Sequence, residues 1–206
     1  MILVTGFGYQ KSTNASGILV QSLKDELPDT LVSFKDAMAF EVITCDETSR
    51  ETEHETLESQ LNELLIRYAP TICIHTGQAP PYNKITIEKI GINSFRREII
   101  DPEGPVAYWS NLPGTDGMRD ILENNGIPAC YSYYCGQHTC NHILYSSLYF
   151  SAQNSRPHKA GFIHVPVLPE QVTEEYRESP YMPLDMARKA LSIIIGHVAS
   201  EAGILA

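Results

Sequence analysis

Thr71-Ile-Cys-Ile-His-Thr76 is a short and almost wholly apolar run that directly follows Pro70. Its length is typical of a strand, and its lack of polar alternation favours a strand that is buried on both faces. Two more runs of this kind occur far away in the chain, at residues 1–6 and at Gly161-Phe-Ile-His-Val165. Buried strands that are separated by long segments predict a parallel sheet with other elements covering both of its faces.

The segments between these runs carry apolar residues at the three- and four-residue spacing of helices with one buried face. We expect helices over residues 15–27, 47–68, about 115–124, about 139–152 and from Pro183 onward. Extended structure is expected at residues 32–45, 84–93 and 128–134, and a long loop at 98–114. The alternation predicts an α/β fold, a three-layer α/β/α sandwich with a mostly parallel central sheet, formed by residues 1–206 as a single domain.

The charge and the apolar runs exclude two classes of partner. The net charge of −10 argues against nucleic acid, because phosphate binding requires clustered Lys and Arg. Apolar runs such as Ile193–Ile195 are far shorter than the roughly 20 residues of a membrane span. The first residues lack the basic segment and long apolar core of a signal peptide, so a cytoplasmic protein is expected.

The five cysteines are an odd number at irregular spacings, which favours reduced thiols over a disulfide framework. Cys135, His138, Cys140 and His142 could in principle bind zinc. Their spacing, C-x2-H-x-C-x-H, is not that of the usual zinc fingers or ribbons, and no second cluster completes it. A metal site at these residues is therefore the minor alternative.

Cys140 is the first candidate for chemistry. The helical pattern begins near Thr139, so Cys140 lies in the first turn, where free backbone N–H groups and the helix dipole favour a thiolate. It shares a helical face with Leu144 and Leu148, so its side chain is expected to point toward the sheet. The alternative is an inert core cysteine.

His164 lies at the end of an apolar strand, two residues before Pro166, and we expect it at the same sheet edge as Cys140. His142 is closer to Cys140 in sequence, but positions two apart on a helix diverge by about 200°. Glu88, within Ile85-Thr-Ile-Glu-Lys-Ile-Gly-Ile-Asn93, could orient a histidine. Taken alone, His164 could equally be a core histidine, and Glu88 the solvent side of a strand.

Six blocks occur together and in order, and they extend over nearly the whole chain. They are Val4-Thr-Gly-Phe7, Asn14-Ala-Ser16, Gly77-Gln-Ala79 with residues 85–93, Gly104-Pro-Val-Ala-Tyr-Trp-Ser-Asn-Leu-Pro113, Cys140-Asn-His142, and Phe162-Ile-His-Val-Pro-Val-Leu-Pro-Glu-Gln171. With these blocks the sequence resembles pyroglutamyl peptidase type I, also called pyrrolidone carboxyl peptidase.

The resemblance implies a cysteine peptidase that hydrolyses the amide bond after an N-terminal pyroglutamyl residue. It matches the family's catalytic glutamate to Glu88, its cysteine to Cys140 and its histidine to His164. It also implies an α/β/α sandwich, a reaction without metal or organic cofactor, and homo-oligomers that are often tetramers. Substrate-binding positions are implied at Phe7, Asn14, Gln78 and Arg97.

The sequence departs from the family pattern in three places. The loop Gly8–Thr13 is shorter, so Tyr9 is the candidate to replace a second pocket aromatic. Glu98 stands where gapless counting places the family's oxyanion arginine, and Arg97 takes that role only after a one-residue shift. Gly136-Gln-His-Thr139 replaces the usual Gly-Thr-aromatic-Val before the nucleophile.

Because of these departures, a second hypothesis keeps the fold as a non-catalytic or altered-specificity protein that binds small molecules or peptides. A nucleoside phosphorylase-like transferase is a more remote alternative, since no basic phosphate site is evident and fold analogy alone cannot carry a function.

Overall fold

A six-stranded sheet with the order β2-β1-β3-β8-β4-β7 forms the centre of the molecule. The computed structural model describes residues 1–9, 12–45, 50–173 and 175–204. The strands are β1 (Ile2–Tyr9), β2 (Met38–Cys45), β3 (Ile72–Gln78), β4 (Ile85–Glu88), β7 (Ala129–Ser132) and β8 (Lys159–Val165). Strands β2, β1, β3 and β8 are parallel, whereas β4 runs antiparallel to β8 and parallel to β7. The predicted mostly parallel sheet is confirmed.

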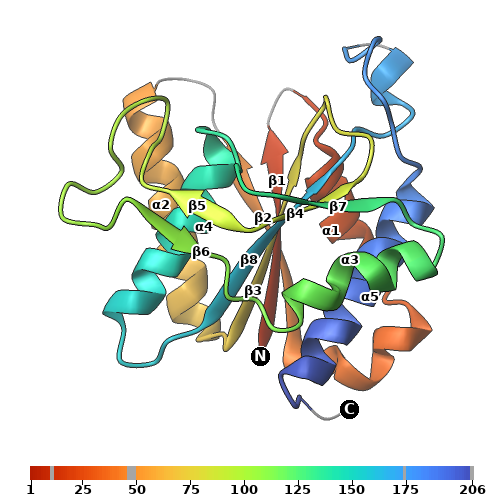
Figure 1. The fold of residues 1–206 in the computed structure, drawn as a ribbon, viewed down its shortest axis with the longest axis horizontal. Coiled ribbons are helices and arrows are strands. Elements are labelled where there is room, and N and C mark those ends of the chain that lie inside the picture. The colour runs from red at the N-terminus through yellow and green to blue at the C-terminus, as the bar shows by residue number, and fades with distance from the viewer. Residues whose placement is uncertain (10–11, 46–49, 174, 205–206) are drawn as a thin grey trace.

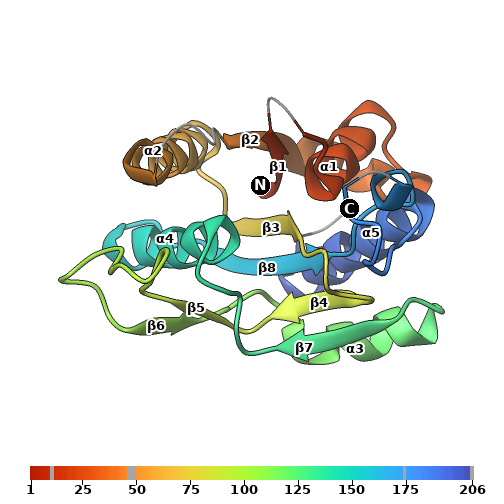
Figure 2. The same cartoon turned by 90° about the horizontal axis from the view of Figure 1, so that it is seen from above.

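Helices cover both faces of this sheet, as Figures 1 and 2 show. One face carries α1 (Ala15–Asp25), α3 (Thr115–Asn124) and α5 (Leu184–Glu201), and the other carries α2 (Arg50–Tyr68) and α4 (Thr139–Gln153). A small antiparallel pair, β5 (Ile90–Ile92) and β6 (Ala107–Trp109), continues beyond β4 on the α4 side. The three-layer sandwich predicted from the sequence is therefore confirmed.

Alternation along the strands divides the buried side chains into two cores. On β1, Ile2 and Val4 belong to the core beneath α1, α3 and α5, while Leu3 and Phe7 belong to the core beneath α2 and α4. On β8, Ile163 belongs to the core beneath α1, α3 and α5, and Phe162 belongs to the core beneath α2 and α4. Any functional side chain at the strand ends is thus assigned to one face by its position in the strand.

Three local expectations from the sequence are wrong. Of residues 32–45, expected to be extended, only Met38–Cys45 form a strand, and residues 32–37 belong to a 3₁₀ helix, η1 (Asp29–Ala37). Leu31 is the only buried residue of η1, and a central strand needs more. The predicted loop 98–114 contains β6. Pro183 is the residue before α5 rather than part of its first turn. Residues 47–49 of the predicted second helix and residues 10 and 11 of the altered loop lie outside the described residues.

Within the described residues, every helix is too short or too polar to cross a lipid bilayer.

Candidate active site

Neighbouring strands bring His164 and Glu88 into direct contact. His164 of β8 lies opposite Thr86 of β4, and Glu88 lies two residues further along the same strand and on the same face. The ring Nδ1–H of His164 donates a hydrogen bond to Glu88 Oε1 over 2.7 Å. Both side chains are buried. The bond fixes the ring's tautomer and leaves Nε2 free to face a reaction partner.

Cys140 lies over the backbone of Gly77, which is the β3 partner of His164 in the parallel register. A Cβ atom added at Gly77 would come within 2.8 Å of Cys140 Sγ and 2.7 Å of the Phe162 ring. Only glycine allows this close approach between strand and helix. The sulfur is therefore placed directly beside the strand pair that carries His164, as the sequence predicted.

The His164 imidazole is poised to carry a charge. Burial, the largest single effect, lowers its pKa, but Cys140 and Glu88 together outweigh it and raise the pKa to about 9. The Cys140 effect on this pKa shows that the sulfur lies close to the ring. Cysteine, histidine and glutamate thus form one connected series, in which the imidazolium lies between two potential anions.

The first turn of α4 has no side-chain cap, and Asn141 binds it to neighbouring backbone. His138, the residue before the helix, provides no side-chain cap, so the first backbone N–H groups remain available to an anion. Asn141 ties this turn to β5: its Oδ1 accepts from the N–H of Ile92 at 2.9 Å, and its Nδ2 donates to the carbonyls of Ile92 and Ser94 at 2.9 and 2.7 Å. An N–H array beside a thiol is the usual form of an oxyanion hole.

His142 is excluded as the base by its position. It is completely buried against the rings of His54 and Phe95, at centroid distances of 4.5 and 5.2 Å. Burial, followed by the nearby His54, lowers its pKa to about 3. The sequence-based argument that its ring points away from the thiol agrees with this packing.

Phe7 and Tyr9 lie on the Cys140 side of the sheet. Phe7 is buried and stacks on Phe162 with a centroid distance of 6.3 Å. Burial raises the pKa of the Tyr9 hydroxyl, and Cys45 and Cys140 both add to this shift, which places Tyr9 near the nucleophile. Phe7 and Tyr9, the two aromatic side chains expected at the pocket, therefore lie on the same face of the sheet as Cys140.

Asn14 and Gln78 are occupied in holding α1. Asn14 caps this helix, because its Oδ1 accepts from the N–H and the hydroxyl of Ser16 at 3.0 and 2.7 Å. Gln78 follows Gly77 and so points to the opposite face from Cys140. Its Oε1 accepts from Ala15 N–H at 2.7 Å and from Gln171 Nε2 at 2.8 Å. The Gln78 side chain is therefore bonded on the α1 side of the sheet, where strand alternation directs it.

Arg97 and Glu98 are both exposed on a tight turn, where Arg97 has a φ of +75°. Arg96 is the anchored member of this segment, because it forms an ion pair with the buried Glu53, which also accepts from Thr139 Oγ1 at 3.2 Å. Arg97 lines a cavity of about 660 Å³ together with residues 136–138, which lead directly to α4. Arg97 therefore lies near the residues that precede Cys140, although Cys140 itself does not line this cavity.

Three neighbours of the site were not predicted. Gly77 provides the close approach described above, for which a glycine directly after a buried strand was the only sequence signal. The Tyr82 ring contacts His164 edge-on at 5.5 Å. The buried thiol of Cys135 lies with Glu88 and His164, their ligand-type atoms all within 4.8 Å of one another. Glu88 and His164 are bonded to each other, and Cys135 is a buried neighbour of this pair.

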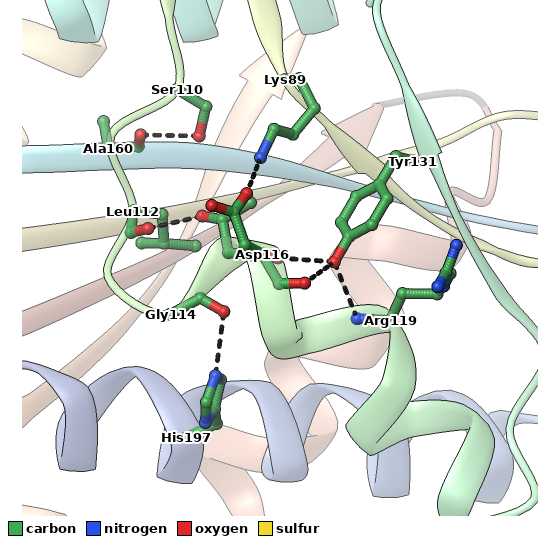
Figure 3. Close-up of polar contacts among 10 residues, drawn as sticks. Lys89, Ser110, Leu112, Gly114, Asp116, Arg119, Tyr131, Ala160 and His197 are labelled. Atoms are coloured by element: carbon green, nitrogen blue, oxygen red, sulfur yellow. Dashed lines mark hydrogen bonds and ion pairs between the residues drawn. The ribbon is translucent and has the colours of Figure 1, made fainter.

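A cavity of about 790 Å³ is in a different place, between β4, β6, α3 and α5. None of Glu88, Cys140 and His164 lines it. As Figure 3 shows, its polar groups bind one another: Lys89 Nζ is paired with Asp116 at 2.7 Å, and His197 Nε2 is bonded to the Gly114 carbonyl at 2.9 Å. Size alone therefore does not locate the chemistry in this protein.

Comparison with known proteins identifies the family. Residues 1–201 match the family model described as pyroglutamyl peptidase. The chain is 35% identical over 152 residues to a pyrrolidone-carboxylate peptidase of Thermococcus litoralis, covering 66% of this chain and 69% of the relative. It is 36% identical over 156 residues to that of Pyrococcus furiosus, covering 68% and 73%.

Solved structures give the same answer over almost the full length. A mutant pyrrolidone carboxyl peptidase from Pyrococcus furiosus superposes with a TM-score of 0.81 at 29% identity, covering 97% of this chain and 98% of that one. Pyroglutamyl peptidase I from Bacillus amyloliquefaciens gives 0.80 at 27% identity, covering 97% and 96%. The chain belongs to the pyroglutamyl peptidase family.

Proposed function

We propose that this protein is a cysteine peptidase that removes an N-terminal pyroglutamyl residue, with Cys140 as nucleophile, His164 as acid and base, and Glu88 as the orienting carboxylate. The observation that carries the proposal is the 2.7 Å hydrogen bond from His164 to Glu88, on the strand pair over which Cys140 Sγ lies. Family membership supports the substrate class.

The reaction uses these three side chains in order. The thiolate of Cys140 attacks the carbonyl carbon of the pyroglutamyl residue and forms a tetrahedral intermediate. As the carbon–nitrogen bond breaks, His164 gives its proton to the leaving amine and a thioester remains. Water then attacks the thioester while His164 takes one of its protons. Collapse of the second intermediate releases pyroglutamate and restores the sulfur.

The oxyanion is stabilised by the backbone N–H groups at the start of α4. The uncapped helix end supports this assignment, and the Asn141 clamp keeps it in place. Arg97 lines the cavity next to residues 136–138, so we assign it a substrate-binding role at the entrance to the site. Glu98 is exposed beside it, and solvent screens both charges.

Phe7 and Tyr9 form the apolar wall for the flat, neutral lactam ring. Asn14 and Gln78 contribute indirectly, because they hold α1 against the end of β3 beside this wall. We further propose that residues 1–206 act as one peptidase domain in the cytoplasm without metal or organic cofactor in catalysis. Cys73, Cys130, Cys135 and Cys140 form no disulfide, which is consistent with a reducing compartment.

Homo-oligomer formation, as a tetramer, completes the proposal. Exposed aromatic and aliphatic side chains support it: Trp109 and Tyr133 are 62% and 61% exposed and contact each other edge-on at 6.1 Å, and Val106 is 84% exposed. Apolar side chains gathered on a surface in this way are typical of subunit contacts.

The proposal is tested with a pyroglutamyl-aminomethylcoumarin reporter. The purified protein should release both the fluorophore and pyroglutamate, the latter identified by mass spectrometry, and should leave the corresponding alanyl and glutaminyl amides intact. Cys140→Ala should abolish release. Cys135→Ala is the matched control, since it removes a neighbouring buried thiol and should retain most of the activity.

A native protein that binds pyroglutamyl amides but never cleaves them would support the non-catalytic binding function instead. An equal loss of activity in Cys135→Ala and Cys140→Ala, with both variants folded, would contradict the assignment of Cys140 as the nucleophile.

A further inference from the structure

A second group of titratable side chains lies between α2 and α4, apart from the catalytic residues. Its centre is His142, which is completely buried, and both of its ring nitrogens lack a hydrogen-bond partner among the described residues. Leaving buried polar atoms unpaired is costly, so native structures rarely do it without a reason such as a bound ion. Packing alone would be served better by a phenylalanine or leucine at this position.

Two further donors from α2 face this ring. His54 and Glu58 are one helical turn apart, with His54 Nδ1 and Glu58 Oε2 separated by 3.9 Å. The His54 ring meets the His142 ring edge-on at a centroid distance of 4.5 Å. One ligand-type atom from each of the three side chains lies within 4.8 Å of the other two. Two imidazoles and a carboxylate thus offer ligand atoms close to one another.

We infer that His54, Glu58 and His142 form a binding site for a divalent transition-metal ion, represented by Zn²⁺. Imidazole and carboxylate donors suit zinc and its neighbours better than Mg²⁺ or Ca²⁺, which prefer oxygen ligands alone. Two histidines and one glutamate are also a known zinc ligand set.

The geometry requires only a small closure. Tetrahedral zinc with ligand bonds of about 2.0–2.1 Å places its donors about 3.3 Å apart. The observed separations, 3.9 Å for the α2 pair and at most 4.8 Å overall, exceed this by about 0.6 Å and at most about 1.5 Å, which side-chain rotation on α2 can supply. His54 and Glu58 are partly exposed, so the open side of the site faces solvent and admits the ion and a water ligand.

The ion would connect the two helices that cover the catalytic face. His142 belongs to the same turn of α4 as Cys140, and Phe95 packs against both histidine rings from the loop after β5. We therefore expect a structural bridge between α2 and α4. It is separate from the Glu88, Cys135 and His164 cluster, which lies beside the nucleophile.

The test is calorimetric titration of ZnCl₂ into chelator-treated protein, carried out in a Cys140→Ala chain so that the nucleophile cannot bind the metal. We expect one zinc ion per chain. His54→Gln and Glu58→Gln should each weaken binding by a factor of about 10 or more, since even partners of metal ligands are commonly worth 10–100-fold. His138→Gln, which removes an exposed histidine outside the group, should bind as the parent does.

Thermal unfolding gives a second readout. Saturating Zn²⁺ should raise the Tm of the parent by several degrees, and this rise should shrink in His54→Gln. Both variants alter partly exposed residues of α2, so they are expected to fold. Absence of zinc binding in the parent overturns the inference, and so does binding that is unchanged by His54→Gln and Glu58→Gln.

Discussion

Two buried histidines on adjacent strands show how this fold separates structure from chemistry. His75 of β3 and His164 of β8 both lie beneath α4 on the same face of the sheet, and each is at most 5% exposed. His75 is bonded only to hydroxyls, Thr5 Oγ1 at 2.8 Å and Ser147 Oγ at 3.0 Å. His164 is bonded to a carboxylate and contacts a thiol.

Their pKa values move in opposite directions. Burial, followed by the nearby His158, lowers the pKa of His75 to about 3. Burial also lowers that of His164, but Cys140 and Glu88 reverse the shift and raise it to about 9. Burial alone therefore does not decide whether an imidazole is charged. The carboxylate and thiol partners at the end of the strands decide it, since they favour the protonated ring.

The largest effect is expected from Glu88→Gln, which makes the surroundings of His164 resemble those of His75. The amide is similar in shape but carries no charge, so the pKa of His164 should fall, and its tautomer is no longer fixed by a carboxylate. We expect kcat to fall by about 10²–10⁴-fold, the usual contribution of positioned acid–base catalysis. The reporter assay measures kcat, and NMR titration of the ring measures the pKa.

Glu53→Gln is the matched control, because it alters a second buried glutamate that serves the Arg96 anchor rather than the imidazole. If Glu88→Gln retains more than about a tenth of native kcat, the carboxylate is not an essential partner of His164.

The pH dependence should differ between the two histidines. The active form carries a protonated His164, so kcat should fall about tenfold per unit of pH above the pKa of about 9. Because this folded-state pKa is raised above the ordinary value near 6.5, the stability that His164 contributes is fully present below about pH 6.5 and is lost as the pH rises toward 9.

For His75 the sign is reversed. Its folded-state pKa is lowered, so the stability linked to its neutral ring is present above about pH 6.5 and is lost as the pH falls toward 3. Denaturant unfolding at a series of pH values measures both losses of stability, the alkaline one from His164 and the acid one from His75. In His75→Leu the acid-side loss should become smaller, and an unchanged acid limb would show that His75 is not a source of it.

His75→Leu should also separate stability from activity at neutral pH. The substitution removes a hydrogen-bond partner from the buried hydroxyl of Thr5, while Ser147 keeps its bond to His158 at 3.0 Å. We expect a loss of about 2 kcal/mol in the free energy of unfolding and a Tm lower by about 4–8 °C. The kcat of the folded protein should stay within about twofold of native. A kcat loss comparable to that of Glu88→Gln would end the distinction between the two rings.

The smallest effect concerns Tyr82, whose ring contacts His164 edge-on at 5.5 Å. Tyr82→Leu removes an aromatic pair worth about 0.5–1.5 kcal/mol, so kcat should fall by about 2- to 10-fold. The Tm should change little, because Tyr82 is only partly buried. A change confined to KM would place Tyr82 on the substrate rather than on the ring.

Much of this arrangement was predictable from the sequence, because buried strands and amphipathic helices leave periodic patterns. The runs at 71–76 and 161–165 gave β3 and β8, and the helical face of Cys140, Leu144 and Leu148 gave the inward direction of the sulfur. The roles of Glu88 and His164 required the family resemblance, since each residue alone fits an inert reading.

The remainder depends on pairings that local patterns do not contain. The reversed direction of β4 relative to β8, which places Glu88 and His164 on one face at adjoining positions, is a long-range choice of register. The direction of Gln78 follows from its exact place in β3 and from partners 63 and 93 residues away. The Arg96 and Glu53 anchor joins residues 43 apart in sequence and carries no motif.

The most direct test of the triad is to map the covalent adduct formed by pyroglutamyl chloromethyl ketone, a substrate-shaped alkylating agent. Peptide mass spectrometry should find one adduct per chain, on Cys140, formed much more slowly when Glu88 is replaced by Gln. An adduct on Cys135, or labelling of Cys140 at the same rate in both chains, would contradict the arrangement of cysteine, histidine and glutamate described here.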